Sequence, residues 1–137
     1  MDVISGYLIG ESLRPGAAFE HPGLRLRKVG RLDVSQSTTA AQPRYWTFVE
    51  WEYEAESTET TESTESADGV DGLAQALAAV LEPEHGWYTD FVAGDEHVVV
   101  FAGKVFRYRR GDEAGRAEAV AYGRSVGTPA HQLDWRE

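Results

Sequence analysis

Residues 45–54 read YWTFVEWEYE, the strongest strand pattern in the chain. Large apolar side chains alternate there with carboxylates, Val49, Trp51 and Tyr53 against Glu50, Glu52 and Glu54. Successive side chains of a strand point to opposite faces, so the spacing predicts a strand with one apolar and one acidic face. Trp46 and Phe48 fall on the acidic side near the start of the run. The strand is therefore either covered on both faces or exposes an aromatic patch.

Two further strands are expected before this one. Val3–Ile9 is apolar enough for a first strand, and Leu24–Arg27 alternates leucine with arginine. The same alternation resumes at Leu32. It places the apolar side chains, which stand at even positions, on one face of the strand and the charged side chains on the other. Gly30 then marks a bulge or a turn within this strand.

A helix and an antiparallel meander are expected after the acidic stretch that follows the 45–54 strand. Apolar residues recur at helical spacing from Val70 to Leu81, Asp68 or Asp71 can cap the start, and Pro83 ends the helix. Short strands joined by glycine turns follow at 87–92, 97–101 and 105–109.

A second helix completes the pattern. It is expected to begin after Asp112 as N-cap and to stop near Gly127, which supplies the left-handed residue after a helix. Thr128 is expected to cap a further helical turn, and Leu133 and Trp135 to dock on the body of the protein.

Together these elements predict an α+β fold. We expect a single domain over residues 1–137, with a twisted, mainly antiparallel sheet of five to six strands and two α-helices. One arrangement places both helices on the same face of the sheet. A length of 137 residues with 42% hydrophobic residues suits one such domain.

The charge balance and the lack of cysteine exclude several classes of function. The chain has 13 Lys and Arg against 23 Asp and Glu, for a formal net charge of -10, the opposite of a surface that binds a phosphate backbone. Without cysteine there is no disulfide, thiolate metal site or cysteine nucleophile. The N-terminus lacks a signal-peptide pattern, and no apolar run reaches the ~18 residues of a membrane helix. We therefore expect a cytoplasmic protein with neither a nucleic-acid nor a membrane partner.

Much of the negative charge lies in one polar segment. Residues 55–72 hold six acids and no base, and the stretch 55–68 offers nothing that would anchor it to a core. Glutamate at every third position would place like charges side by side on a helix, and Ser and Thr compete for its backbone hydrogen bonds. We expect a disordered acidic loop at 55–68.

The C-terminal region carries a stretch that resembles other proteins. It reads FRYRRGD from Phe106 to Asp112, YGRSVGTP from Tyr122 to Pro129, and QLDW from Gln132 to Trp135. It resembles a group of small, acidic, uncharacterised bacterial proteins, actinobacterial in character. The resemblance implies no activity, cofactor or site residue.

A basic cluster is the first candidate site, made of Lys104, Arg107, Arg109 and Arg110. It leads into the N-terminus of the second helix, where guanidinium forks and backbone N–H groups can hold a phosphate or carboxylate. An Asp112 N-cap would already occupy those donors, which argues against an anion site. In the alternative interpretation, Arg107 and Arg109 pair with the glutamates of the 45–54 strand.

The glutamate row at Glu50, Glu52 and Glu54 is the second candidate. Carboxylates about 7 Å apart suit acid–base catalysis or a hard metal ion, yet such a row is also typical of a solvated sheet face. The histidines lack the spacing of a metal motif; they are His21, His85, His97 and His131. The chain contains no nucleophile elbow, P-loop or dinucleotide fingerprint. The sequence thus predicts no cofactor, no metal site and no catalytic residue.

Two functions remain open at this point. The first is a non-enzymatic protein-interaction module, comparable to acidic inhibitors and immunity proteins, that uses an aromatic and arginine-bearing surface. The second is a small anionic-ligand-binding protein or enzyme that uses the arginines, with Glu50, Glu52 or His97 as acid or base. A homodimer through an exposed edge strand is a further arrangement. The site residues of the two hypotheses are Arg107, Arg109, Arg110, Trp46, Glu50 and Glu52.

Overall fold

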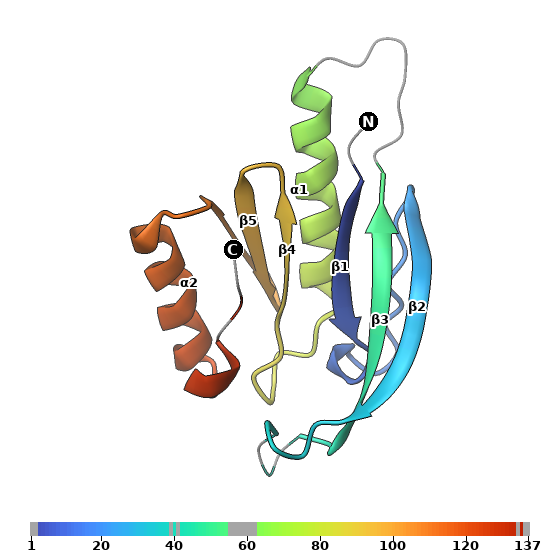
Figure 1. Ribbon diagram of the computed structural model, residues 1–137, viewed down its shortest axis with the longest axis vertical. Helices are drawn as coiled ribbons and strands as arrows, with labels where there is room; N and C mark the ends of the chain where they lie inside the picture. Colours follow the sequence, from blue (N-terminus) through green and yellow to red (C-terminus); the bar gives the residue numbers. More distant parts are fainter. Residues whose placement is uncertain (1–2, 39, 41, 55–62, 134, 136–137) are drawn as a thin grey trace.

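The computed structural model describes residues 3–38, 40, 42–54, 63–133 and 135 (Figure 1). The strands are β1 (Ile4–Ile9), β2 (Leu24–Asp33), β3 (Tyr45–Tyr53), β4 (Thr89–Ala93), β5 (Glu96–Phe101) and β6 (Lys104–Arg109). The helices are α1 (Ser63–Val80), α2 (Glu113–Ser125) and two short 3-10 turns, η1 (Gly10–Ser12) and η2 (Ala130–Gln132). Among the described residues, no helix is both long and apolar enough to cross a membrane.

The six strands form one sheet in the order β2-β3-β1-β4-β5-β6. Every neighbouring pair is antiparallel. The predicted α+β fold class is therefore confirmed, including the meander of β4, β5 and β6. In β3, alternation places Glu50 and Glu52 on one face, while Trp51 and Tyr53 are buried on the other.

The two helices pack on opposite faces of the sheet, and β5 shows why. Val98 and Val100 join the core under α1, whereas Val99 and Phe101 join the core beside α2. A strand that is buried on both faces reads as a continuous apolar run, and residues 98–101 are such a run. The arrangement with both helices on one face is therefore wrong.

The second helix covers only half of its face of the sheet. α2 packs over β5 and β6 together with Leu133 and Trp135, both buried as expected. On the other half of the sheet, α1 covers one face of β1 and β3 (Figure 1). No described helix packs against the opposite face of β1, β3 and β2. We call it the uncovered face; its side chains include Tyr7, Lys28, Leu32, Phe48, Glu50 and Glu52.

Helix α1 begins at Ser63, earlier than the amphipathic pattern from Val70 indicates. Its buried side is the predicted one and includes Leu73 and Leu77, both without exposed surface. Of the range 55–68 expected as a disordered loop, residues 55–62 lie outside the described residues and 63–68 are helical. Ser, Thr and acidic residues are favoured in the first turn of a helix, which offsets their low propensity farther inside.

The edge strand β2 contains a bulge that changes the expected facing of its side chains. The register shifts between Leu26 and Lys28, so the irregularity does not lie at Gly30. Because an extra residue moves the alternation by one, Leu26 pairs with Trp51 on the α1 side, whereas Leu32 lies on the uncovered face. The expectation that the even positions share one apolar face is therefore wrong.

The start and end of α2 follow the predicted signals. Asp112 is the N-cap, and its carboxylate accepts a hydrogen bond from the backbone N–H of Gly115 at 3.2 Å. Gly127 has a φ of 97°, the left-handed conformation expected after the helix. The predicted cap at Thr128 is wrong, because Pro129 precedes η2. The Thr128 hydroxyl instead donates to the carbonyl of Gly86 at 3.0 Å.

Candidate functional site

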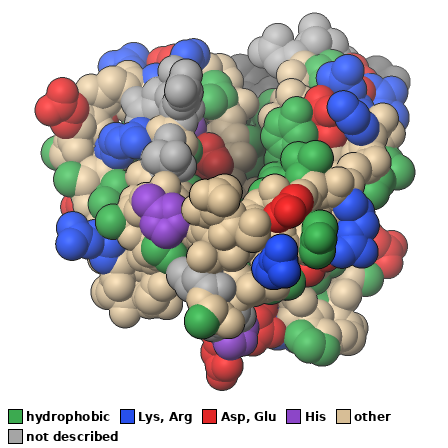
Figure 2. Space-filling model, turned by 60° about the horizontal axis from the view of Figure 1, so that its bottom comes forward, with side chains coloured by type: hydrophobic (Ala, Val, Ile, Leu, Met, Phe, Trp, Pro, Cys, Tyr) green, Lys and Arg blue, Asp and Glu red, His purple; other side chains and the backbone are tan. Residues whose placement is uncertain are grey.

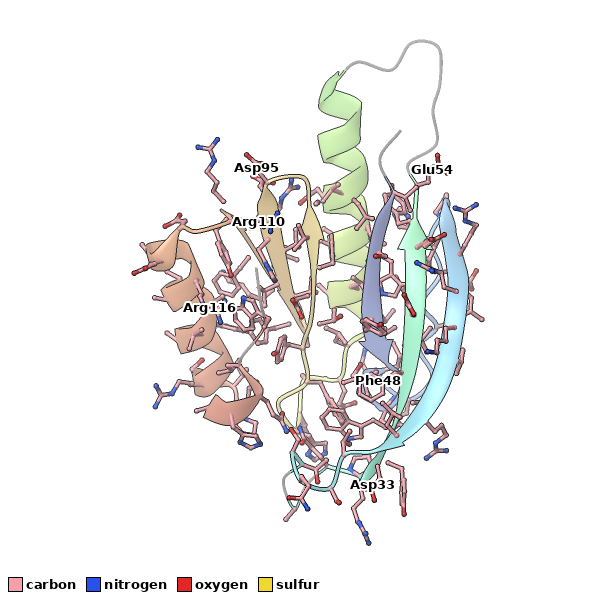
Figure 3. All side chains as sticks on the ribbon, viewed as in Figure 1. Asp33, Phe48, Glu54, Asp95, Arg110 and Arg116 are labelled. Carbon is pink, nitrogen blue, oxygen red and sulfur yellow. The ribbon has the colours of Figure 1, made fainter. Side chains whose placement is uncertain are left out.

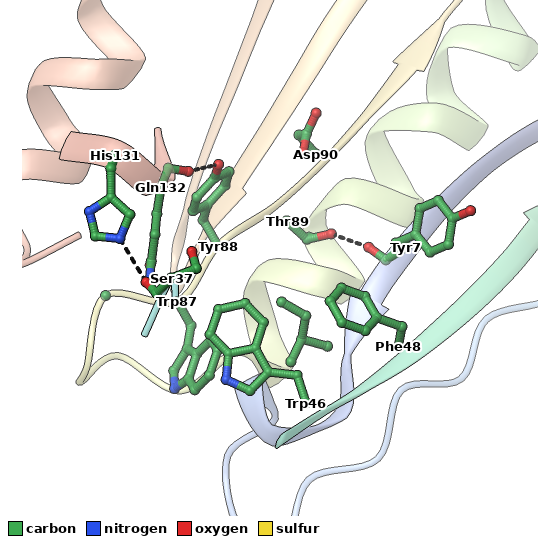
Figure 4. A pocket seen from close by; sticks show the side chains of 12 residues that line it. Tyr7, Ser37, Trp46, Phe48, Trp87, Tyr88, Thr89, Asp90, His131 and Gln132 are labelled. Carbon is green, nitrogen blue, oxygen red and sulfur yellow. Dashed lines mark hydrogen bonds between the residues drawn. The ribbon is translucent and has the colours of Figure 1, made fainter. Parts of the chain in front are cut away.

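A pocket of about 260 Å³ opens beside the uncovered face, where β1 and β3 approach the start of β4 (Figure 4). Aromatic side chains form most of its walls, namely Tyr7, Trp46, Phe48, Trp87 and Tyr88. Polar groups complete the lining, with Asp90 and Thr89 from β4, Ser37, and His131 and Gln132 from η2. Segments from both ends of the chain therefore build one concave site.

The junction of β1 and β4 determines where the pocket forms. These strands are paired through one residue couple, Gly6 with Phe91, whereas β1 and β3 are paired along the whole of β1. Next to this couple, the Thr89 hydroxyl donates to the carbonyl of Tyr7 at 2.7 Å. The sheet is thus held together at this point partly by a side chain, and the pocket lies beside it.

The aromatic walls hold one another in place. The Trp46 ring contacts the Trp87 ring edge-on, with centroids 5.1 Å apart, and lies 6.2 Å from the Phe48 ring. The indole N–H of Trp46 donates to the carbonyl of Pro43 at 2.9 Å, which fixes the ring orientation. Trp46 is buried, so it contributes a wall rather than an exposed anchor.

The C-terminal turn closes the pocket through a hydrogen-bond network. Gln132 Nε2 donates to the carbonyl of Ser37 at 2.5 Å and to Gln42 Oε1 at 2.9 Å. His131 Nε2 also lies 2.7 Å from the Ser37 carbonyl, and the Tyr88 hydroxyl donates to the Gln132 carbonyl. Since these bonds join residues far apart in sequence, the rim of the pocket is preorganised.

Asp90 supplies the carboxylate of the pocket. Its Oδ2 lies 2.8 Å from Nε2 of His97, a side chain without exposed surface, whereas the Asp90 side chain is 29% exposed. Within the described part of the chain, no hydrogen bond reaches the buried Nδ1 of His97. A hydrogen on that atom would be an unsatisfied buried donor, so the tautomer with hydrogen on Nε2, donating to Asp90, fits the site.

Aromatic contacts hold the His97 ring behind Asp90. The ring stacks on Tyr108 at a centroid distance of 5.8 Å and lies 6.1 Å from the Trp135 ring. Trp135 Nε1 donates to the Tyr108 hydroxyl at 2.8 Å, and the Arg116 guanidinium lies over the Trp135 ring. His97 is therefore placed to orient Asp90, and burial keeps it from touching anything in the pocket.

A groove on the uncovered face continues from the pocket. It is lined by Tyr7, Lys28, Gly30, Leu32, Phe48 and Glu50. Tyr7 and Phe48 line both depressions, so the pocket and the groove form one continuous surface. Figure 2 shows hydrophobic side chains gathered beside a hollow on the face turned toward the viewer.

The glutamate row lies along this groove, but its charge is partly compensated by β2. Arg25 lies 3.3 Å from Glu52, and Arg27 lies 3.3 Å from Glu52 and 3.7 Å from Glu50. The basic partners therefore come from the neighbouring edge strand. The expected pairing of this row with Arg107 and Arg109 is wrong, because three strands separate β3 from β6.

The predicted arginine cluster lies elsewhere and does not join the pocket. Arg107 forms an ion pair with Glu96, and Arg109 lies 3.5 Å from Asp95. The backbone N–H of Arg110 bonds to the Asp95 carbonyl at 2.8 Å. Figure 3 shows Asp95 and Arg110 at the end of the sheet remote from Phe48. Of the six predicted site residues, Trp46 and Glu50 line the pocket or the groove, Glu52 lies beside them, and the arginines are separate.

Sequence reasoning did not identify Tyr7, Asp90 and Gln132 as site residues. Each stands alone in its segment, without a motif that would distinguish it. The aromatic pair Trp87 and Tyr88 just before Asp90 is the one local signal that could have pointed to the pocket.

Comparisons with known proteins give no indication of function, so the function is inferred from the geometry of the site. Within the described residues, no three His, Asp or Glu side chains gather in a way that could hold a metal ion. Neither the protein-family models, nor the curated proteins, nor the solved structures yielded a match to this chain. The resemblance of its C-terminal stretch to small acidic bacterial proteins therefore stays an expectation.

Proposed function

We propose that the protein is a non-enzymatic interaction module that docks a basic protein partner on the uncovered face of the sheet. The observation that carries this proposal is an apolar surface that no helix of the described residues covers. Tyr7 is 56% exposed and Leu32 is 54% exposed, and between them lies the groove that leads into the pocket. Large apolar side chains gathered around a groove on the surface of a small protein are typical of binding sites.

The composition of the surface favours a protein partner. Tyr, Trp and Phe form the centre, while Arg25, Arg27, Glu50 and Glu52 form an ion-paired rim. Interfaces commonly combine aromatic centres with a polar rim, and a few aromatic anchors carry most of the binding free energy. The groove is open along the strands, which suits an extended segment of a partner.

Overall charge favours a partner that is basic. A formal net charge of -10, of which six acids lie in residues 55–72, raises the rate at which a cationic protein approaches this protein, and the effect weakens as salt screens the charges. Acidic inhibitors and immunity proteins act on basic targets in this way. An inhibitor-like role is therefore the form of the proposal that fits the charge best.

Pairing of two copies through β2 is less favourable. The edge strand carries Arg25, Arg27, Lys28 and Arg31 within seven residues. Antiparallel pairing with a second β2 would place these cations against one another, and like charges on adjacent strands are destabilising. The same residues protect the edge from self-association.

Anion binding at the arginine cluster has weaker support. Arg107 and Arg109 already face carboxylates of the β4 to β5 region, and the depression beside Arg110 is shallow and includes Asp95 itself. A phosphate or carboxylate would have to displace these partners. No second function is therefore proposed for this cluster.

Site-specific photo-crosslinking tests the docking surface. A benzoyl-phenylalanine replaces Leu32 in one variant and the exposed Glu118 of α2 in a matched control, and each is irradiated in a lysate of the source organism. The proposal expects one discrete crosslinked protein of basic composition from position 32, absent at position 118 and weakened by added salt. Equal crosslinking from both positions, or a product equal to two copies of this chain, would contradict it.

A further inference from the structure

The pocket combines an aromatic lining with one carboxylate, and the docking of an apolar segment does not need the carboxylate. We propose that it receives the guanidinium group of an arginine side chain presented by the basic partner. This inference rests on the docking function proposed above. It assigns the pocket a chemical specificity that the groove alone does not have.

The aromatic walls provide the first part of this specificity. Trp46, Phe48 and Tyr88 lie around the opening in Figure 4, and Tyr7 and Trp87 complete the lining. Cations are attracted to the faces of aromatic rings, and a planar guanidinium also stacks on them. Rings that are fixed by Trp46 Nε1 and by the Tyr88 hydroxyl need little rearrangement to accept it.

Asp90 provides the second part of this specificity, a carboxylate that can bind a cation. Its Oδ2 accepts from His97, while Oδ1 accepts no hydrogen bond from the described residues. The hydrogen bond from the Nε2–H tautomer of His97 fixes the orientation of the carboxylate. A guanidinium forms its strongest hydrogen bonds with such a carboxylate, since charge and geometry match.

None of the described residues that line the pocket forms a hydrogen bond or an ion pair with the Asp90 carboxylate. No Lys or Arg of the described chain lines the pocket, and Lys28 lies in the groove on the far side of Tyr7. His131 is the one other titratable base in the lining, and its Nε2 faces the Ser37 carbonyl. A cation that enters the pocket therefore meets one carboxylate and no fixed cationic competitor from Lys or Arg.

The size and position of the pocket suit a side chain of a docked segment. The cavity of about 260 Å³ has room for the end of one side chain. Its continuity with the groove lets the backbone of a bound segment lie outside while one side chain enters. Arginine has the reach and the planar cationic end that this shape requires.

A matched pair of probes tests the inference on the intact protein. N-acetyl-L-argininamide and its neutral isostere N-acetyl-L-citrullinamide are titrated against the protein while amide and indole signals are followed by NMR. We expect the arginine derivative to bind at least tenfold more tightly and to shift the indole signals of Trp46 and Trp87. Asp90→Asn should remove this preference, whereas Asp95→Asn, an equal charge change outside the pocket, should retain it.

The outcomes separate this inference from the docking function. Equal binding of the two probes to the wild-type protein would overturn the arginine inference without relying on any variant. If crosslinking from position 32 persisted in that case, the docking function would stand alone. If the arginine preference were found but position 32 gave no crosslink, the pocket inference would hold and the docking function would fail.

Discussion

Asp90 and His97 form a hydrogen-bonded pair in which the imidazole is fully buried and the carboxylate reaches the pocket, with 2.8 Å between Oδ2 and Nε2. Both side chains lie on the α2 side of the sheet, since Asp90 is paired with Val99 and Val92 with His97 across β4 and β5. His97 packs against Tyr108 and Trp135 in the core beside α2, whereas Asp90 lines the cavity next to it. A buried imidazole thus orients a partly exposed carboxylate.

Removal of the Asp90 acceptor should destabilise the protein through His97. In Asp90→Ala the buried Nε2–H loses its partner, and an unsatisfied buried donor costs about 1–3 kcal/mol. Asp90→Asn keeps an oxygen at this position and should cost less. Urea unfolding followed by tryptophan fluorescence measures both; equal losses would show that the acceptor does not matter.

Alanine at Gly6 should disrupt the junction of β1 and β4. A Cβ there would lie 2.6 Å from Cζ2 of the buried Trp51 ring, so overpacking should cost about 1–3 kcal/mol. Gly72→Ala is the matched control in helix α1. Its new Cβ would come no nearer than 3.5 Å to His21 Nε2, and the higher helix propensity should stabilise the protein by about 1 kcal/mol. Thermal unfolding of the two variants should shift in opposite directions.

The ion pairs of the glutamate row should contribute little to stability. Arg25 and Arg27 are 61% and 50% exposed, and exposed pairs are worth about 1 kcal/mol or less. Arg25→Ala and Arg27→Ala should each cost no more than this, and the cost should shrink as salt is added. A larger loss that does not respond to salt would mean that the stems of these arginines stabilise the sheet by packing.

Acid should weaken the turn after β2. The backbone N–H of Ser35 donates to Asp33 Oδ1 at 3.0 Å and, with the Ser35 side chain and Arg44, holds the pKa of that carboxyl below its ordinary value of 3.8. A folded-state pKa below the unfolded one stabilises the protein above the unfolded pKa, and this contribution is lost as pH falls through the folded pKa. The difference in stability between wild type and Asp33→Asn should therefore change at acidic pH and stay constant near neutrality. If the difference in stability between the two proteins were the same at every pH, the pKa of Asp33 would not be lowered in the folded protein.

Local signals in the sequence predicted much of the fold. Alternation along β3 predicted the face on which Glu50 and Glu52 lie, and Asp112 and Gly127 predicted the two ends of α2. These features could be predicted because each depends only on residues close together in the sequence. The helix start, the bulge after Leu26 and the opposite faces of the helices were missed. A bulge leaves no distinctive residue, and the placement of helices depends on which strands become neighbours.

The candidate site was much harder to predict, because it is assembled from distant segments. Tyr7 and Thr89, which join at the edge of the pocket, lie 82 positions apart. His97 follows two acidic residues and was expected near a turn, yet its ring is buried in the core, where it contacts the rings of Tyr108 and Trp135. Periodicity does not determine the order of strands, and that order decides which side chains meet.

Amide hydrogen exchange with and without the partner captured at position 32 tests the docking surface most directly. We expect slower exchange in β2, in β1 and in residues 86–90 at the pocket, and unchanged exchange in α2. Protection confined to α2 or to the β6 arginines, with β1 and β2 unaffected, would contradict the uncovered face as the docking surface.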